Sequence, residues 1–268
     1  MRLIIKPDYA AVSAWAANYV AGRINDHARG GEARPFVLGL PTGSSPVGTY
    51  GALAALNRAG KVSFKNVVTF NMDEYVGLGE EHPQSYHRFM EENLFSKIDI
   101  PSGNANLLDG DAADLEAECR RYEERIARCG GIDLFVGGIG EDGHIAFNEP
   151  GSSLASRTRA MTLAEDTRKV NARFFGGEPG KVPAMALTVG VGTIMDAREI
   201  LLVVSGTNKA RALRHAVEEG VSQLWTASCV QLHPKAILVC DEDSIAELKV
   251  GTARYFTGIE KKEFDYPA

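Results

Sequence analysis

The residues best suited to chemistry lie in one glycine-rich segment, residues 137–151, which reads GGIGEDGHIAFNEPG. It places Asp142, His144 and Glu149 within eight positions of one another. One carboxylate can orient a histidine ring while the other raises its affinity for a proton. Such a group is suited to moving protons to and from a bound molecule, and the glycines let the backbone come close to that molecule.

The same three side chains could instead bind a metal ion, because histidine and carboxylates are common ligands. Against this alternative, the sequence has no His-x-His or His-Glu-x-x-His spacing. We therefore expect acid–base chemistry here rather than a metal site.

A second pair of carboxylates, Asp73 and Glu74, follows the apolar run at residues 67–70. At the carboxyl end of a strand, either could act as a general base. The alternative is that both carboxylates are only solvated, as carboxylates in loops commonly are.

Three features are suited to binding an anion. The segment at residues 41–46, PTGSSP, lies between an apolar run and a predicted helix, so it offers free backbone N–H groups, hydroxyls and a helix N-terminus. It lacks the Gly-Lys-Ser/Thr ending of a nucleotide-binding P-loop, and a simple turn is the alternative. Lys209 begins a predicted helix, where a cation is unfavourable unless an anion binds beside it. Arg173 precedes a glycine- and proline-rich segment, and together these features predict a phosphorylated small molecule.

The elements that must position these residues alternate along the whole chain. Helical spacing predicts helices near residues 12–24, 47–58 and 111–129, with Asp8 as a possible N-cap of the first. Between them are short runs that are apolar on both faces, as is typical of central parallel strands, at 36–40, 67–70, 132–136, 200–204 and 236–240. This alternation predicts one α/β domain over residues 1–268 with a mostly parallel sheet. The texture of the glycine- and proline-rich stretch predicts a mobile lid over about residues 160–185.

Composition excludes several classes of protein. The 268 residues include 29 Lys and Arg against 35 Asp and Glu, a net charge of −6, which argues against nucleic-acid binding. Four cysteines without a C-x-x-C pair indicate reduced thiols. No apolar run is long enough for a signal peptide or a membrane span, so we expect a cytoplasmic protein with no membrane partner.

The sequence resembles the glucosamine-6-phosphate deaminase family over nearly its whole length. The resemblance implies a cofactor-free enzyme of amino-sugar catabolism that converts glucosamine 6-phosphate and water to fructose 6-phosphate and ammonia. It also implies a Rossmann-like open sheet with helices on both faces, and a homohexamer. The matching segments are FVLGLPTGSSP (36–46), VVTFNMDEYV (67–76), HPQSY (82–86), GGIGEDGHIAFNEPGSSL (137–154), SRTR (156–159) and LHPKAILVC (232–240).

The resemblance also implies roles for individual residues. Asp73 matches the base that carries a proton from C2 to C1, and His144, with Asp142 and Glu149, matches the group that opens the pyranose ring. The residues that match phosphate contacts are Thr42, Gly43, Ser44, Arg173 and Lys209.

Hexameric members of the family have an allosteric site for N-acetylglucosamine 6-phosphate. The residues that match it are Ser152, Arg159, Thr162 and Tyr255. Met161 stands where allosteric members have a lysine, so we expect activation to be weak or absent. Gly220 replaces a cysteine of some members near Cys229, and we expect Cys229 to remain a free thiol.

Two alternatives remain open on the same fold. A related sugar-phosphate isomerase or lactonase would use the same phosphate contacts, but a lactonase needs no proton carrier between C1 and C2. A non-catalytic phosphosugar sensor would normally carry a DNA-binding segment. Residues 1–35 show one amphipathic helix and no helix-turn-helix pair, which argues against the sensor.

Overall fold

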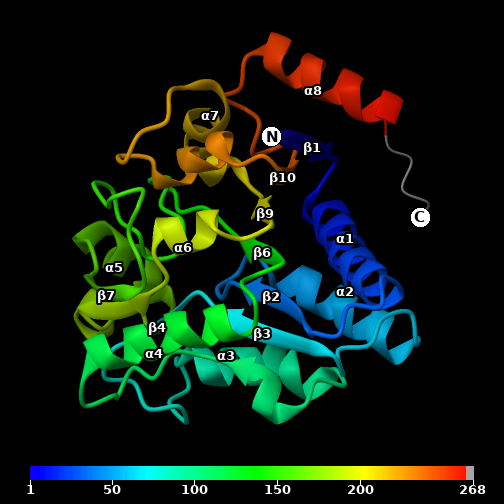
Figure 1. The fold of residues 1–268 in the computed structure, drawn as a ribbon. Helices are drawn as coiled ribbons and strands as arrows, with labels where there is room; N and C mark the ends of the chain where they lie inside the picture. Colours follow the sequence, from blue (N-terminus) through cyan, green and yellow to red (C-terminus); the bar gives the residue numbers. More distant parts are fainter. Residues whose placement is uncertain (264–268) are drawn as a thin grey trace.

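The computed structural model describes residues 1–263, and the side chains of residues 1–260. A seven-stranded sheet in the order β1-β10-β9-β6-β2-β3-β5 forms its centre, and all neighbouring strands in it are parallel (Figure 1). The strands are β1 (Arg2–Lys6), β10 (Ala236–Asp241), β9 (Glu199–Val204), β6 (Leu134–Gly137), β2 (Phe36–Leu40), β3 (Val67–Asn71) and β5 (Ala105–Asn106).

Helices cover both faces of this sheet, because both faces of its strands are apolar. Val37 packs into the core on one face, and its neighbour Leu38 packs into the core on the other. The helices of the Leu38 face are α1 (Tyr9–Arg29), α2 (Val47–Arg58) and α3 (Tyr86–Asn93). Those of the Val37 face are α4 (Leu115–Arg128), α6 (Val191–Met195) and α7 (Ala210–Glu218). The predicted α/β fold with helices on both faces is confirmed.

The terminal helix α8 (Val250–Glu263) covers the β1 edge of the sheet (Figure 1). Arg2 donates hydrogen bonds to both carboxylate oxygens of Glu260, at 2.9 and 2.8 Å, and so joins the first strand to the last helix. Short 3-10 turns complete the chain: η1 (Phe95–Lys97), η2 (Ser102–Asn104), η3 (Ala172–Phe174), η4 (Pro179–Lys181), η5 (Thr207–Lys209) and η6 (Thr226–Leu232).

The predicted strand at residues 36–40 and the predicted helix at 47–58 have the bounds that the structure shows. The Asp8 side chain caps α1 by accepting a hydrogen bond from the Ala11 amide at 2.8 Å, as predicted. The predicted start of the helix at residue 111 is wrong. Asp114 accepts a hydrogen bond from the Ala117 amide and so fixes the start of α4 at Leu115.

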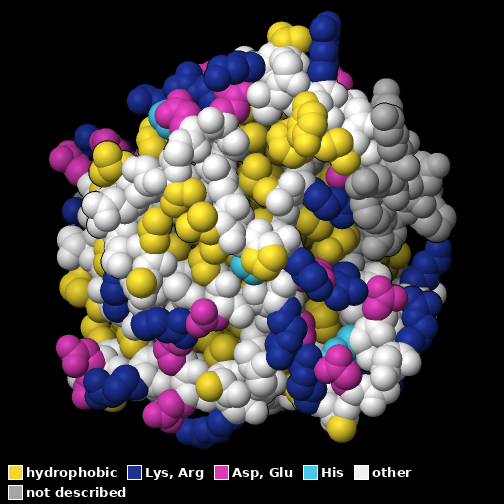
Figure 2. Space-filling model, turned by 45° about the horizontal axis from the view of Figure 1, so that its top comes forward, with side chains coloured by type: hydrophobic (Ala, Val, Ile, Leu, Met, Phe, Trp, Pro, Cys, Tyr) yellow, Lys and Arg dark blue, Asp and Glu magenta, His cyan; other side chains and the backbone are white. Residues whose placement is uncertain are grey.

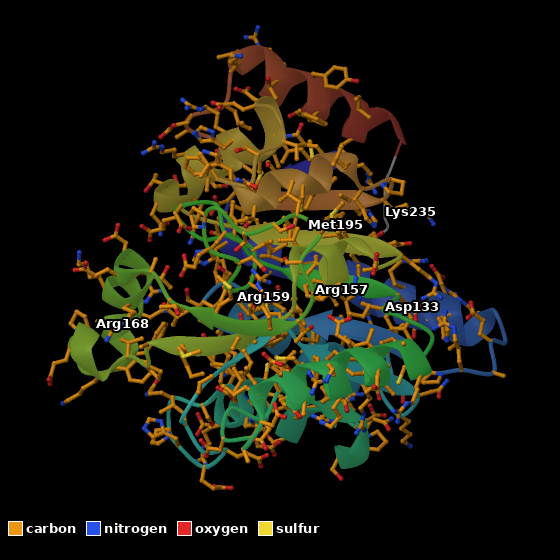
Figure 3. All side chains as sticks on the ribbon, turned by 60° about the vertical axis from the view of Figure 1, so that its left-hand side comes forward. Asp133, Arg157, Arg159, Arg168, Met195 and Lys235 are labelled. Atoms are coloured by element: carbon orange, nitrogen blue, oxygen red, sulfur yellow. The ribbon has the colours of Figure 1, made fainter. Side chains whose placement is uncertain are left out.

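A second, antiparallel sheet was not predicted. Its strands are β4 (Asp73–Tyr75), β8 (Met185–Thr188) and β7 (Arg159–Thr162), in that order. With helix α5 (Glu165–Asn171) and the turns η3 and η4, β7 and the start of β8 make up most of the segment predicted as a lid. Arg168, at the outer edge of this segment, donates hydrogen bonds to the carbonyl oxygens of Pro179 and Val182 (Figure 3). The segment predicted as a lid is therefore a folded unit with internal contacts, and both its role as a lid and its motion stay predictions.

All four cysteines are free, so the prediction for Cys229 is confirmed. Among the described residues, no helix has the length and apolar character needed to cross a membrane.

Candidate active site

The candidate site is a cleft of about 660 Å³ at the carboxyl ends of the parallel strands. After β2 the chain continues outward to β3 and β5, and after β6 it continues in the opposite direction to β9 and β10. Neighbouring β2 and β6 therefore form the topological switch point, where open α/β sheets bind ligands. Eight of the nine residues predicted for catalysis or phosphate binding line the cleft: Thr42, Gly43, Ser44, Asp73, Asp142, His144, Arg173 and Lys209.

The structure separates the two carboxylates that the sequence left equivalent. Successive residues of a strand point to opposite sides, and in β4 only Asp73 lines the cleft. Glu74 is fully buried on the other side, where its carboxylate accepts hydrogen bonds from the backbone amides of Tyr86 and His87 at the start of α3. Its distance to Nδ1 of His87 is 3.0 Å. Glu74 therefore holds α3 in place and is not available as a base.

Asp73 is buried, and burial raises its pKa well above the ordinary value. The neighbouring charge of Glu74 raises it further, whereas a hydrogen bond from the Thr42 hydroxyl lowers it. Within the described residues, the buried oxygen Oδ1 of Asp73 has no hydrogen-bond partner. A carboxylate with strong affinity for a proton and one free oxygen is suited to proton transfer with a bound molecule.

His144 lies between the two carboxylates predicted to flank it. Its Nδ1 is 2.8 Å from Oδ1 of Asp142 and 3.8 Å from Oε2 of Glu149. The contact between Nδ1 of His144 and Asp142 is short enough for an ion pair, but its geometry is not that of a hydrogen bond from the ring N–H. Burial opposes ionisation of Asp142, but the side chain and backbone amide of His144 outweigh it and lower the pKa of Asp142. Glu149 is buried behind the ring, and its other oxygen accepts a hydrogen bond from the Ala164 amide at 3.1 Å, at the start of α5.

The glycines of this loop are required by close packing. Gly143 has a φ of +80°, and a Cβ there would lie 2.4 Å from Cε3 of Trp225. Gly151 has a φ of +93° but has open space around it. A side chain at Gly151 would therefore cause backbone strain alone, whereas one at Gly143 would cause both strain and a steric clash.

We expect Gly143→Ala to reduce both stability and activity, because the loop must move away from Trp225 and take His144 with it. Gly151→Ala is the matched control and should cost only the strain of a positive φ, about 1 kcal/mol. Urea denaturation should show Gly143→Ala to be the less stable variant by at least about 1 kcal/mol more. Equal losses for the two variants would contradict the packing argument.

The anion-binding features also come together. Within the described residues, no backbone amide of residues 42–45 donates a hydrogen bond to the protein, so these groups are free to bind a ligand. Lys209 lies at the start of α7, half-buried. Burial lowers the pKa of Lys209, and the charge of Arg173, which lines the same cleft, lowers it further. Two neighbouring cations and a free amide nest form a site for a doubly charged group.

Several residues that line the cleft were not predicted from the sequence. Arg211, Trp225, Tyr86 and Asn171 line the cleft but belong to no motif with an obvious chemistry. The guanidinium of Arg211 lies 5.4 Å from the ring of Trp225, and the ring of His215 stacks on that indole at 3.7 Å. HPQSY, quoted above, contains Tyr86, but nothing in the sequence indicated a role for its side chain.

The residues predicted for an allosteric site are only partly assembled in this chain. Arg159 donates hydrogen bonds to Asn148 at 2.9 Å and to Ser152 at 3.1 Å. Burial lowers the pKa of Arg159, which has no carboxylate partner among the described residues. Met161 and Thr162 follow on the same strand, β7. Tyr255 is 64% exposed on α8, far from β7 in Figure 1.

Asp142, His144 and Glu149 are also the one group of described residues that could share a metal ion, since their ligand atoms lie within 4.8 Å of one another. The arrangement therefore permits both of the chemistries considered from the sequence. An open parallel sheet with an anion subsite and a carboxylate–histidine group at its switch point is typical of α/β proteins that act on phosphorylated small molecules.

Comparison with known proteins identifies the family. The family described as glucosamine-6-phosphate isomerases/6-phosphogluconolactonase matches residues 7–239, and this chain belongs to it. The chain is 62% identical over 261 residues to the glucosamine-6-phosphate deaminase of Phocaeicola vulgatus, covering 97% of this chain and 99% of that protein. It is 59% identical over 265 residues to that of Borreliella afzelii, covering 99% and 98%.

Two solved structures share the fold of this chain. A monomeric glucosamine-6-phosphate deaminase superimposes with a TM-score of 0.87 at 40% identity, covering 92% of this chain and 99% of that one. The 6-phosphogluconolactonase of Trypanosoma cruzi superimposes with a TM-score of 0.72 at 18% identity, covering 92% and 97%. The second match shows a shared fold only.

Proposed function

We propose that this protein is a glucosamine-6-phosphate deaminase, which converts glucosamine 6-phosphate and water to fructose 6-phosphate and ammonia in amino-sugar catabolism. The observation that carries the proposal is the pairing, within one anion-binding cleft, of the buried carboxylate Asp73 with the carboxylate-flanked His144. The high identity to relatives of that name supports it.

The geometry divides the reaction between two groups. The phosphate binds Lys209, Arg173 and the amides after β2, which fixes the sugar. His144, oriented by Asp142 and Glu149, takes the proton of the O1 hydroxyl, and the ring oxygen receives a proton as the ring opens. Asp73 then removes the C2 proton and returns it to C1 through an enolamine. C2 is left as an iminium carbon, water adds to it, and ammonia leaves.

Release of ammonia from glucosamine 6-phosphate by the purified protein tests the proposal directly. Hydrolysis of 6-phosphogluconolactone without ammonia release would instead favour a lactonase. Tight binding of the sugar phosphate with neither reaction would favour a sensor.

We expect prolonged dialysis against a chelator to leave ammonia release unchanged within about twofold, because proton transfer by Asp73 and His144 needs no Lewis acid. The check is an assay before and after dialysis, followed by addition of Zn²⁺ or Mn²⁺. A loss of activity that either ion restores would show that Asp142, His144 and Glu149 bind a metal.

We propose that N-acetylglucosamine 6-phosphate activates the enzyme weakly or not at all, because Met161 supplies no cation beside Arg159. Met161→Lys should introduce or strengthen activation, since a hydrogen bond to a charged group contributes about 1.5–3 kcal/mol. Met161→Leu is the matched control and should behave as the wild type. Rate-versus-substrate curves with and without the N-acetyl sugar test this, and a strong leftward shift in the wild type would contradict it.

We propose that the enzyme acts as a homohexamer in the cytoplasm. The exposed apolar residues Leu232, Val250 and Tyr255 support association, and Figure 2 shows hydrophobic side chains gathered on the face that this view brings forward. Tyr255 could meet Ser152 and Arg159 only if a second copy supplied it. The similar deaminase of known structure is monomeric, so light scattering of this protein is needed to decide between the two states.

A further inference from the structure

One turn of the loop that carries His144 contains a residue in an unusual conformation. Ala146 has a φ of +53° and is the one residue other than glycine with a positive φ among those that the structure describes. The amide of Asn148 donates a hydrogen bond to the carbonyl oxygen of Ile145 at 3.2 Å, so residues 145–148 form a β-turn with Ala146 as its first central residue. A turn with a positive φ at that position alone is of type II′, where glycine is the usual residue. The alanine is therefore strained, and the surrounding structure must hold it there.

Two threonine hydroxyls hold this turn, and they come from two different segments of the chain. The amide of Ile145, before Ala146, donates a hydrogen bond to Oγ1 of Thr226 at 3.2 Å. The amide of Phe147, after Ala146, donates one to Oγ1 of Thr188 at 3.1 Å. Both threonines are fully buried, and a buried amide without a partner is costly. The strained residue is therefore fixed at the peptide groups on both sides of it.

The Thr226 hydroxyl also reaches the other end of the turn. It donates a hydrogen bond to the carbonyl oxygen of Asn148 at 2.9 Å, so one side chain joins the first and last residues of the turn. The side-chain nitrogen of Asn148 donates hydrogen bonds to the carbonyl oxygens of Ile145 and Val189, both at 2.9 Å. Because Glu149 follows Asn148 directly, the direction of the chain at Asn148 determines where the Glu149 carboxylate lies.

The segment at residues 223–227 supports the same loop through its backbone. Its last amide donates a hydrogen bond to the carbonyl oxygen of Gly143 at 2.9 Å, and its first carbonyl oxygen accepts one from the amide of Gly151 at 2.8 Å. These two bonds hold the ends of the loop and do not involve a threonine hydroxyl. Removal of one hydroxyl therefore tests the turn at Ala146 and not the attachment of the whole loop.

We propose that Thr226 and Thr188 are positioning residues, which keep the turn at Ala146 in its strained form and so keep Glu149 beside the ring of His144. Nδ1 of His144 is 3.8 Å from Oε2 of Glu149, and the turn lies between these two residues in the chain. Relaxation of Ala146 to a negative φ would rotate the peptide groups on both sides of it. A displacement of about 1 Å in an active site can lower a rate about 100-fold. This inference rests on the proposed function, since that function gives His144 its role in opening the sugar ring.

Thr226→Val tests the inference, because valine has the shape of threonine but can neither accept nor donate a hydrogen bond. We expect kcat for ammonia release to fall about 10–100-fold and KM to change by less than about threefold, since the phosphate contacts lie on other segments. Thr226→Ser keeps the hydroxyl and should retain kcat within about threefold of the wild type. Thr193→Val is the matched control, because Thr193 is also buried but its hydroxyl donates to Glu123, outside the cleft. It should leave kcat unchanged.

Hydrogen exchange at the turn gives a measurement that does not depend on activity. The amides of Ile145 and Phe147 should exchange at least about tenfold faster in Thr226→Val than in the wild type, because loss of a hydrogen bond makes local opening easier. In Thr226→Ser and Thr193→Val, both amides should exchange as slowly as in the wild type.

Three results would overturn the inference. The first is unchanged exchange in folded Thr226→Val, or in folded Thr188→Val if the former does not fold. The second is faster exchange with an unchanged kcat, since the turn would then not position His144. The third is a loss of kcat in Thr226→Ser as large as in Thr226→Val. If exchange becomes faster as expected but the wild type releases no ammonia, the role of the threonines in the turn stands and the proposed function fails.

Discussion

Asp73→Asn should abolish ammonia release, by about 10²–10⁴-fold in kcat, and at the same time raise the melting temperature at neutral pH. The loss follows because the amide cannot take the C2 proton. The gain follows because burial makes the charged carboxylate unfavourable in the folded state. Few substitutions of a single group should move activity and stability so far in opposite directions.

The sign of the stability effect depends on pH. The pKa of Asp73 is raised in the folded protein, so the folded state binds this proton more tightly than the unfolded chain does. The folded state therefore loses stability as the pH rises above the ordinary aspartate pKa of about 3.9. Melting curves should show that the gain from Asp73→Asn is large at pH 7.5 and small at pH 4.5.

Glu74→Gln is the matched control, since it makes the same exchange one residue along the strand. Glu74 accepts hydrogen bonds from the amides of Tyr75, Tyr86 and His87, so an amide there would weaken the start of α3. We expect this variant to lose stability and to keep most of its activity. A stabilised Glu74→Gln, or an active Asp73→Asn, would show that the two roles have been assigned the wrong way round.

The contrast between Asp73 and Glu74 also shows how much of the site can be predicted from the sequence. The sequence places two carboxylates after a strand, and strand geometry requires them to face opposite sides. Which side is the cleft depends on where β8 and α3 pack, and those contacts involve residues more than ten positions away. The same limit hides the hydrogen bond between Asn171 and Tyr75, because the two residues are 96 positions apart in the chain.

The fold itself was easier to predict from the sequence than the site, for a physical reason. Central strands such as β2 are buried on both faces and therefore appear as continuous apolar runs. The edge strand β1 and the short strands β4 and β7 form no such run. Strand β7 is largely half-buried, and β4, although buried, has only three residues, two of them acidic. Their pairing is set by tertiary contacts, so the antiparallel sheet that holds Asp73 left no pattern to detect.

Lys209→Met should raise KM for glucosamine 6-phosphate about 100-fold while changing kcat much less, because an interaction with the phosphate is made equally before and during the reaction. Arg211→Met is the matched control: its side chain lines the same cleft but is exposed and lies over Trp225. Its KM should change by less than about threefold. Equal effects of the two substitutions would place the phosphate nearer the mouth of the cleft.

The pH dependence of binding gives an independent test of Lys209. Burial, the largest cause, lowers the pKa of Lys209, so its charge is lost at a lower pH than the ordinary lysine value of about 10.4. Phosphate binding should therefore weaken on the alkaline side as Lys209 loses its proton. Lys209→Arg keeps its charge to far higher pH and should move the basic limb of kcat/KM upward. Glucosamine without its phosphate should show no such limb, because no dianion then depends on this proton.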